Sequence, residues 1–169
     1  LANVLLADFT RIEKIEISKF FFNRQIELKI TERKGDFLWC SSQNKCFYMT
    51  KDGLVFERTE NIENKIIFMG ILENNPLMKN FATSVKMQNY ESLISVLKNS
   101  GFEISSINIE SGDKAIAKTN INNFVSDIIF NPEEKDLSLV AQNIILLIKE
   151  TQIKNTSAHF NYIDARFGN

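Results

Sequence analysis

The sequence predicts an α+β fold, in which a mainly antiparallel sheet with two covering helices is preceded by a partial helix–strand–strand unit. Most of the chain divides into short apolar or alternating runs that are typical of strands. Two later segments, 87–99 and 136–150, instead carry apolar residues at helical spacing. Composition agrees, because 44% of the 169 residues are hydrophobic, which is enough to build a core. Runs of strands with a few helices are typical of this fold class.

The N-terminal part predicts a helix end followed by two strands. Residues 1–9 are expected to form the C-terminal part of an amphipathic helix. Residues 12–18 are expected to form a strand. The segment 25–31 alternates between apolar and polar side chains, so we expect a half-buried antiparallel strand there. Its apolar positions are Ile26, Leu28 and Ile30. Three consecutive phenylalanines, Phe20–Phe22, occupy the connection and are expected to pack on a neighbour.

The rest of the chain predicts the main sheet and its two helices. The expected strands are 37–40, 46–50, 54–58, 66–69, 102–110, 115–119, 124–130 and 158–167. Asp52-Gly53 is a strong hairpin signal between the second and third of these strands. The first helix is expected to stop at Ser100-Gly101, and Asp136 is positioned to cap the second.

The two cysteines are expected to face each other across a hairpin. Cys40 and Cys46 flank a short polar loop between two apolar runs. A disulfide is geometrically possible there and would indicate an oxidising compartment, while free buried thiols are the alternative. A zinc site would need further ligands, and the single histidine, His159, lies far away in the sequence. Trp39 is expected to pack in the core against the disulfide.

Composition and motifs argue against several classes of function. The 20 basic residues nearly balance the 21 acidic ones, so nucleic acid is not an expected partner. The sequence has no P-loop, dinucleotide-binding fingerprint, nucleophile elbow or histidine pair, so we expect neither an enzyme nor a cofactor. No stretch approaches the roughly 20 apolar residues of a membrane span. Because Leu1 is not an initiator methionine, the chain is expected to be a piece of a longer protein.

The C-terminal stretch 162–169 predicts a binding edge. Its strand-forming residues lead into the turn Gly168-Asn169, after which no further strand follows. An edge of this kind leaves backbone groups unpaired and favours the addition of a strand from another chain. Asp164 and Arg166 share one face and either orient a partner or form a local ion pair. Phe167 either anchors a partner or belongs to the core.

Three stretches in order resemble the extracytoplasmic region of the FtsQ/DivIB bacterial cell-division proteins. Residues 28–33, ending in Glu32-Arg33, are similar to the last strand of the POTRA subdomain of that family. Leu38-Trp39 and then 47–56 resemble the hairpin that opens its β subdomain, and 162–167 resembles its near-terminal signature. Two features depart from the family. Lys34-Gly35 follows where members usually have a proline, and the cysteine pair is not general in the family.

The resemblance implies a domain division and a role. Residues 1–34 would be the C-terminal part of a POTRA-like subdomain, and residues 35–169 an FtsQ/DivIB-like β subdomain. The parent protein would be anchored in the inner (cell) membrane by one N-terminal transmembrane helix and would act as a non-catalytic scaffold at the division septum. It would bind small bitopic division proteins of the FtsB/FtsL type through its last strands. The candidate partner-binding residues are Tyr162, Asp164, Arg166, Phe167, Gly168 and Asn169.

Two other functions stay open on the sequence. One is a POTRA-containing module of an envelope assembly or secretion system, which repeated POTRA units would distinguish. The other is a carrier of small ligands, which would need an apolar cavity in the sheet. Glu32-Arg33 is expected to be an ion pair at the end of its strand.

Overall fold

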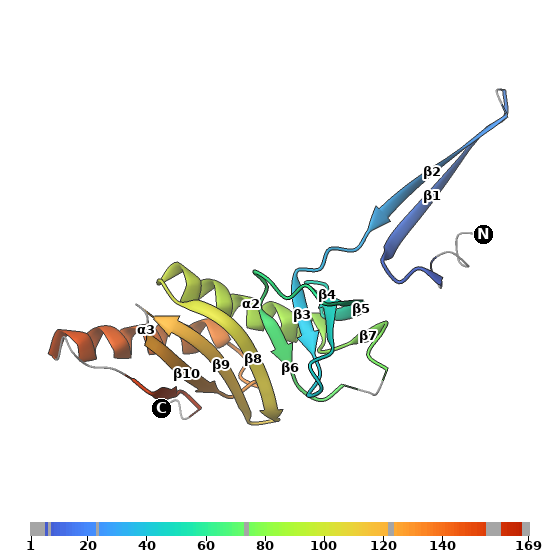
Figure 1. Ribbon diagram of the computed structural model, residues 1–169. Coiled ribbons are helices and arrows are strands. Elements are labelled where there is room, and N and C mark those ends of the chain that lie inside the picture. The colour runs from blue at the N-terminus through green and yellow to red at the C-terminus, as the bar shows by residue number, and fades with distance from the viewer. Residues whose placement is uncertain are drawn as a thin grey trace.

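The computed structural model describes residues 6, 8–22, 24–72, 75–121, 124–154 and 160–166. It confirms the predicted α+β class. Figure 1 shows one large sheet with the helices α2 (Ser84–Asn99) and α3 (Leu137–Lys154) on one face, and a separate two-stranded ribbon that projects from it. In the predicted N-terminal helix, Leu6 and Asp8 are helical, and residues 1–5 and 7 lie outside the described residues.

The large sheet contains nine strands in the order β11-β10-β9-β8-β6-β3-β4-β5-β7. Strand β6 pairs in parallel with both β3 and β8, and β10 pairs in parallel with β11, while the other neighbours are antiparallel. The strands are β3 (Phe37–Cys40), β4 (Cys46–Met49), β5 (Leu54–Thr59), β6 (Ile67–Met69), β7 (Lys79–Asn80), β8 (Glu103–Ser111), β9 (Lys114–Ile121), β10 (Phe124–Phe130) and β11 (Tyr162–Asp164). The sequence did not predict β7, which has only two residues.

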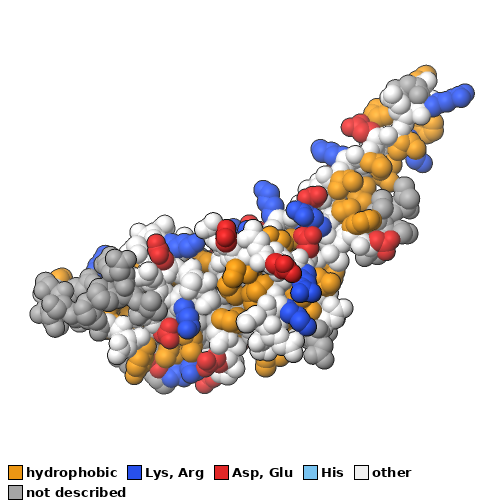
Figure 2. Space-filling model, viewed as in Figure 1, with side chains coloured by type: hydrophobic (Ala, Val, Ile, Leu, Met, Phe, Trp, Pro, Cys, Tyr) orange, Lys and Arg blue, Asp and Glu red, His pale blue; other side chains and the backbone are white. Residues whose placement is uncertain are grey.

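The ribbon consists of β1 (Ile12–Phe20) and β2 (Gln25–Glu32), paired from Ile12↔Glu32 to Phe20↔Gln25. The prediction that β2 is half-buried is wrong, because every residue of this strand is exposed. Side-chain alternation is present, but no described element covers the apolar side. Figure 2 shows the resulting row of hydrophobic side chains along the ribbon. Phe21 and Phe22 are exposed too, so the expectation that they pack on a neighbour is also wrong.

Hydrogen bonds and ion pairs tie the base of the ribbon together. Arg11 Nε contacts Glu32 Oε2 at 3.1 Å, and Arg33 Nε donates to the Thr10 carbonyl at 3.0 Å. Glu32 therefore pairs across the ribbon with Arg11, not with its neighbour Arg33 as the sequence suggested. Arg11 also lies 3.6 Å from Glu57 on β5, which places the base of the ribbon beside the large sheet.

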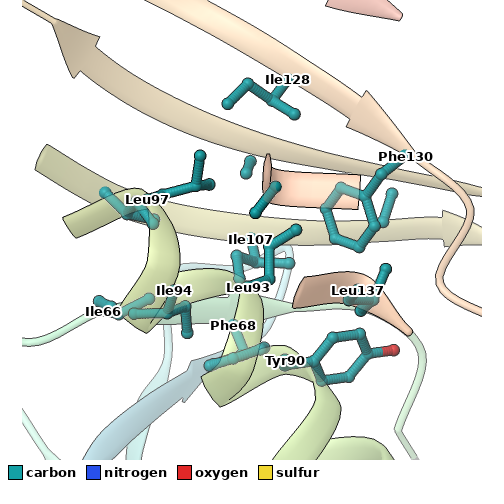
Figure 3. Close-up of a cluster of buried hydrophobic side chains, with 14 of the residues drawn as sticks. Ile66, Phe68, Tyr90, Leu93, Ile94, Leu97, Ile107, Ile128, Phe130 and Leu137 are labelled. Carbon is teal, nitrogen blue, oxygen red and sulfur yellow. The ribbon is translucent and has the colours of Figure 1, made fainter. Parts of the chain in front are cut away.

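The main core lies between the large sheet and the two helices, as Figure 3 shows. Phe68 on the central strand β6 is fully buried, and its ring lies 5.2 Å from Phe37, 5.6 Å from Phe81 and 5.8 Å from Tyr90. Edge-on and tilted ring pairs at these distances contribute beyond their buried area. Burial, with a smaller effect of the Glu133 carboxylate, raises the pKa of Tyr90 to about 12.

Both helices begin with the caps that their sequences provide. The Thr83 hydroxyl accepts a hydrogen bond from the Lys86 amide at the start of α2. Asp136 accepts from the amides of Ser138 and Leu139, each at 3.0 Å, as its sequence position predicted for α3. Asn89 of α2 joins the two helix starts, because its side chain accepts from the Leu137 amide and donates to the Glu134 carbonyl.

The disulfide Cys40–Cys46 is present, with the two residues directly opposite each other in the β3–β4 hairpin. Both cysteines are buried together with Leu38 on the side of the sheet away from the helices, against Tyr48, Ile67 and Met69. Trp39 is buried as predicted, but it belongs to the main core and packs on Phe47. Neighbouring residues of a strand point to opposite faces, so Trp39 and Cys40 lie in different clusters.

Candidate partner-binding edge of the sheet

Strand β11 forms one edge of the large sheet. It pairs in parallel with β10 through Asp127↔Tyr162, Ile128↔Ile163 and Ile129↔Asp164. The Asp127 amide donates to the Asn161 carbonyl at 3.4 Å, and the Ala165 amide donates to the Ile129 carbonyl at 2.8 Å. Among the residues that the structure describes, no strand pairs with the other side of β11.

The backbone of two β11 residues faces outward. In an extended strand, successive residues direct their N–H and C=O groups to alternate sides. Since Asn161 and Ala165 bond to β10, the backbone groups of Tyr162 and Asp164 point away from the sheet. Each of the two residues has one donor and one acceptor, so the edge offers two donors and two acceptors to an added strand.

The side chains of β11 divide between the core and the surface. Ile163 is buried on the helix side and is paired with the fully buried Ile128. Tyr162 lies on the other side and is 62% exposed. A large aromatic side chain beside outward-facing backbone groups is a suitable contact for a partner, because aromatic residues are enriched where interfaces gain most of their energy.

Asp164 and Arg166 form an ion pair at the end of the strand. Arg166 Nη2 lies 2.7 Å from Asp164 Oδ2, and its Nε lies 3.0 Å from Asp164 Oδ1. The side-chain hydrogen bond from Arg166 lowers the pKa of Asp164, with smaller help from the Arg166 amide, the Arg166 charge and the charge of Lys114. The same pair raises the pKa of Arg166, and Asp113 adds to this effect. Asp164 therefore stays charged at neutral pH and holds Arg166 in a fixed position beside the edge.

The structure brings together three of the predicted site residues. Tyr162, Asp164 and Arg166 lie at the β11 edge as expected, and the predicted charge pair is present. The remaining predicted residues Phe167, Gly168 and Asn169 lie outside the described residues, as does His159. The predicted strand 158–167 is too long, because Phe160, Asn161, Ala165 and Arg166 are not in a strand.

Asp113 and Lys114 lie close enough to the candidate site to act on its charges, and the sequence analysis did not predict them there. They lie in and after the turn between β8 and β9, and their charges act on Asp164 and Arg166. This turn is far from the C-terminus in sequence. Only the order β8-β9-β10-β11 places it near the end of β11, and the sequence pattern carries no signal for that order.

The opposite edge of the sheet is less suited to strand addition. Strand β7 has two residues, follows Pro76 closely and includes Lys79. Short strands, proline and lysine are devices by which proteins protect an edge against pairing. Strand β5 extends beyond β7, but this outer part contains Glu57 and Arg58. These features favour β11 as the edge that accepts a partner.

Other kinds of site find little support in the described part of the chain. A hollow of about 600 Å³ lies beside the disulfide hairpin, but its lining mixes polar and apolar residues without a charged cluster. No group of three or more His, Cys, Asp or Glu residues there could hold a metal ion. None of the described helices combines the length and apolar character needed to cross a bilayer.

Comparison with known proteins gives no family assignment. No protein-family model matches this sequence, and no curated protein matches it.

Proposed function

We propose that this chain is most of the extracytoplasmic region of a division protein of the FtsQ/DivIB type. It acts as a scaffold without catalysis and binds small bitopic division proteins of the FtsB/FtsL type by strand addition at β11. The observation that carries the proposal is the outward-facing backbone of Tyr162 and Asp164 at an edge with no described neighbour. The family resemblance depends partly on the motif 162–167, and the described residues of this motif, 162–166, lie at this edge.

The size of the edge limits what backbone pairing alone can contribute. Four hydrogen bonds at a net of about 0.5–1.5 kcal/mol each amount to roughly 2–6 kcal/mol. Association costs at least about 4 kcal/mol in lost translational and rotational freedom. Side-chain contacts must therefore supply much of the affinity. Tyr162 and the fixed Arg166 are the described side chains placed to provide them.

Proline substitution at Asp164 tests the backbone contribution. Asp164→Pro removes the outward N–H and leaves the inward bond of Ala165 to Ile129 in place. Asp164→Ala is the matched control, since it removes the same carboxylate and its ion pair with Arg166 but keeps the N–H. The measurement is the Kd of a fluorescent peptide from the juxtamembrane segment of an FtsB-like protein, determined by anisotropy with the 169-residue chain.

We expect Asp164→Pro to weaken binding about tenfold more than Asp164→Ala, since a lost hydrogen bond of about 1.4 kcal/mol corresponds to that factor. Equal losses in the two variants would show recognition through side chains and contradict strand addition. Urea unfolding followed by Trp39 fluorescence shows whether each variant is folded. If the folded wild-type chain does not bind such peptides, the division role is wrong and an envelope assembly or secretion module becomes the better hypothesis.

A further inference from the structure

The far end of the β1–β2 ribbon carries three adjacent exposed aromatic side chains. Phe20 is 48% exposed, Phe21 is 87% exposed and Phe22 is fully exposed. Phe20 pairs with Gln25 and closes the ribbon, and Phe21 and Phe22 lie in the turn beyond this pair. We refer to Phe20–Phe22 with Lys19 and Arg24 as the ribbon tip.

The ribbon holds this tip away from the rest of the protein. Strand β2 has eight residues, which at about 3.3 Å each corresponds to a length of roughly 26 Å. Figure 1 shows the ribbon running outward from the large sheet, with the turn at its far end. No described residue outside the ribbon covers the phenylalanines.

The charge at the tip has one sign. Lys19 and Arg24 flank the phenylalanines, and no described carboxylate pairs with either of them. The nearest acidic residues, Glu16 and Glu27, lie further down the ribbon, and Glu16 is paired with Lys14. The tip therefore combines exposed aromatic rings with two positive charges.

We propose that the ribbon tip inserts into the surface of a lipid bilayer that contains anionic phospholipids. Phe21 and Phe22 enter the boundary between the headgroups and the acyl chains, while Lys19 and Arg24 contact the phosphates. Aromatic side chains with flanking cations are the combination that such a surface binds, through apolar burial and electrostatic attraction.

The small area of the tip favours a bilayer over a protein partner. At about 200 Å² for each ring, the exposed fractions give roughly 500 Å² of aromatic surface. A specific protein interface commonly buries about 800 Å² on each partner. The aromatic surface of the tip alone falls short of this area. A bilayer can accept it, because lipids adapt to the shape of an inserted group.

This proposal does not depend on the proposed function. The ribbon tip and strand β11 lie at opposite ends of the molecule in Figure 1, so one site can fail without the other. The test is cosedimentation of the 169-residue chain with vesicles of phosphatidylethanolamine and phosphatidylglycerol, compared with vesicles of phosphatidylcholine alone.

Three variants separate the contributions. The double substitution Phe21→Ser and Phe22→Ser removes the aromatic rings, and Lys19→Gln with Arg24→Gln removes the charges. The matched control is Ile71→Ser with Val85→Ser, which removes two exposed apolar side chains at other places on the surface. All of these positions are exposed, so the variants are expected to fold, and urea unfolding followed by Trp39 fluorescence verifies this.

We expect the chain to bind the anionic vesicles and the control variant to bind equally well. The serine variant should bind at least tenfold more weakly, since burial of even one ring contributes about that factor. The glutamine variant should lose about fivefold or more. Phe21→Trp should show a blue-shifted emission that brominated lipids quench, above the background of the buried Trp39.

Three results would overturn the proposal. The first is no binding of the folded wild-type chain to anionic vesicles. The second is equal binding by the wild-type chain and the serine variant. The third is self-association of the chain in the absence of lipid that the serine variant abolishes, without any binding to vesicles, because the tip would then serve a contact between protein chains.

Discussion

Removal of the Cys40–Cys46 disulfide should lower the free energy of unfolding by an amount that depends on the number of residues in the loop that the disulfide closes. The cysteines are six residues apart. In the chain-entropy model a loop of that size corresponds to about 7.4 cal/mol/K, or about 2.2 kcal/mol at 25 °C. These 2.2 kcal/mol count only the conformational entropy that the disulfide removes from the unfolded chain. The hairpin itself is held by further pairs and by the neighbouring strands β5 and β6, so it should survive in the folded state without the bond.

Urea unfolding of the double variant Cys40→Ala and Cys46→Ala, followed by the emission of Trp39, measures this loss. Trp39 is the only tryptophan and lies next to Cys40, so it reports on unfolding of this region. Reduction of the wild-type chain with dithiothreitol is the matched control, because it opens the same loop without a change of sequence. We expect both to lose about 2 kcal/mol. A loss below about 0.5 kcal/mol in both would refute the reasoning and show that the unfolded chain already closes this loop by its own turn.

Two further predictions concern the helix starts. Asn89→Ala should lower the free energy of unfolding in urea by about 1–3 kcal/mol, because it leaves the partly buried Leu137 amide without its acceptor. Asn89→Asp keeps an acceptor oxygen and should recover part of this loss. Equal losses in the two variants would contradict the capping role of Asn89. Hydrogen bonds from the Ser138 hydroxyl and the Leu139 amide lower the pKa of Asp136 in the folded protein. The stabilisation by this carboxylate is therefore complete above the ordinary aspartate pKa of about 4. It is lost as the pH falls through the lower pKa that Asp136 has in the folded state. Unfolding between pH 2 and 6 should therefore show a smaller acid loss in Asp136→Asn, which keeps a capping oxygen, and an unchanged pH profile would contradict this assignment.

Local signals in the sequence predicted the local structure well. Asp52-Gly53 makes the expected turn, with Gly53 at a φ of +95°, where a Cβ would also lie 2.9 Å from Met87 Cγ. The opposed cysteines and the Asp136 cap likewise depend on residues within a few positions of one another. The turn, the cysteine pairing and the helix cap each depend on residues within one short segment, so the sequence predicts their positions to within a few residues.

The sequence could not predict what covers each face or which distant segments meet. The alternation of Ile26, Leu28 and Ile30 gives the side on which they lie, but not whether anything packs there. The partner of Glu32 is 21 positions away in the ribbon, which only its register determines. At the candidate site, the outward direction of the Tyr162 backbone follows from the parallel pairing of β11 with β10, and no local pattern specifies that pairing.

The position of β6 has a consequence for how the protein folds. This three-residue strand is the only one that joins β3, β4, β5 and β7 to β8, β9, β10 and β11 in the described sheet. Most pairs within each half are antiparallel hairpins between neighbouring segments, which form quickly. Pairing of Phe68 with Ile107 instead requires closure of a loop that contains all of α2. We therefore expect the union of the two halves through β6 to be slower than the formation of the hairpins within each half.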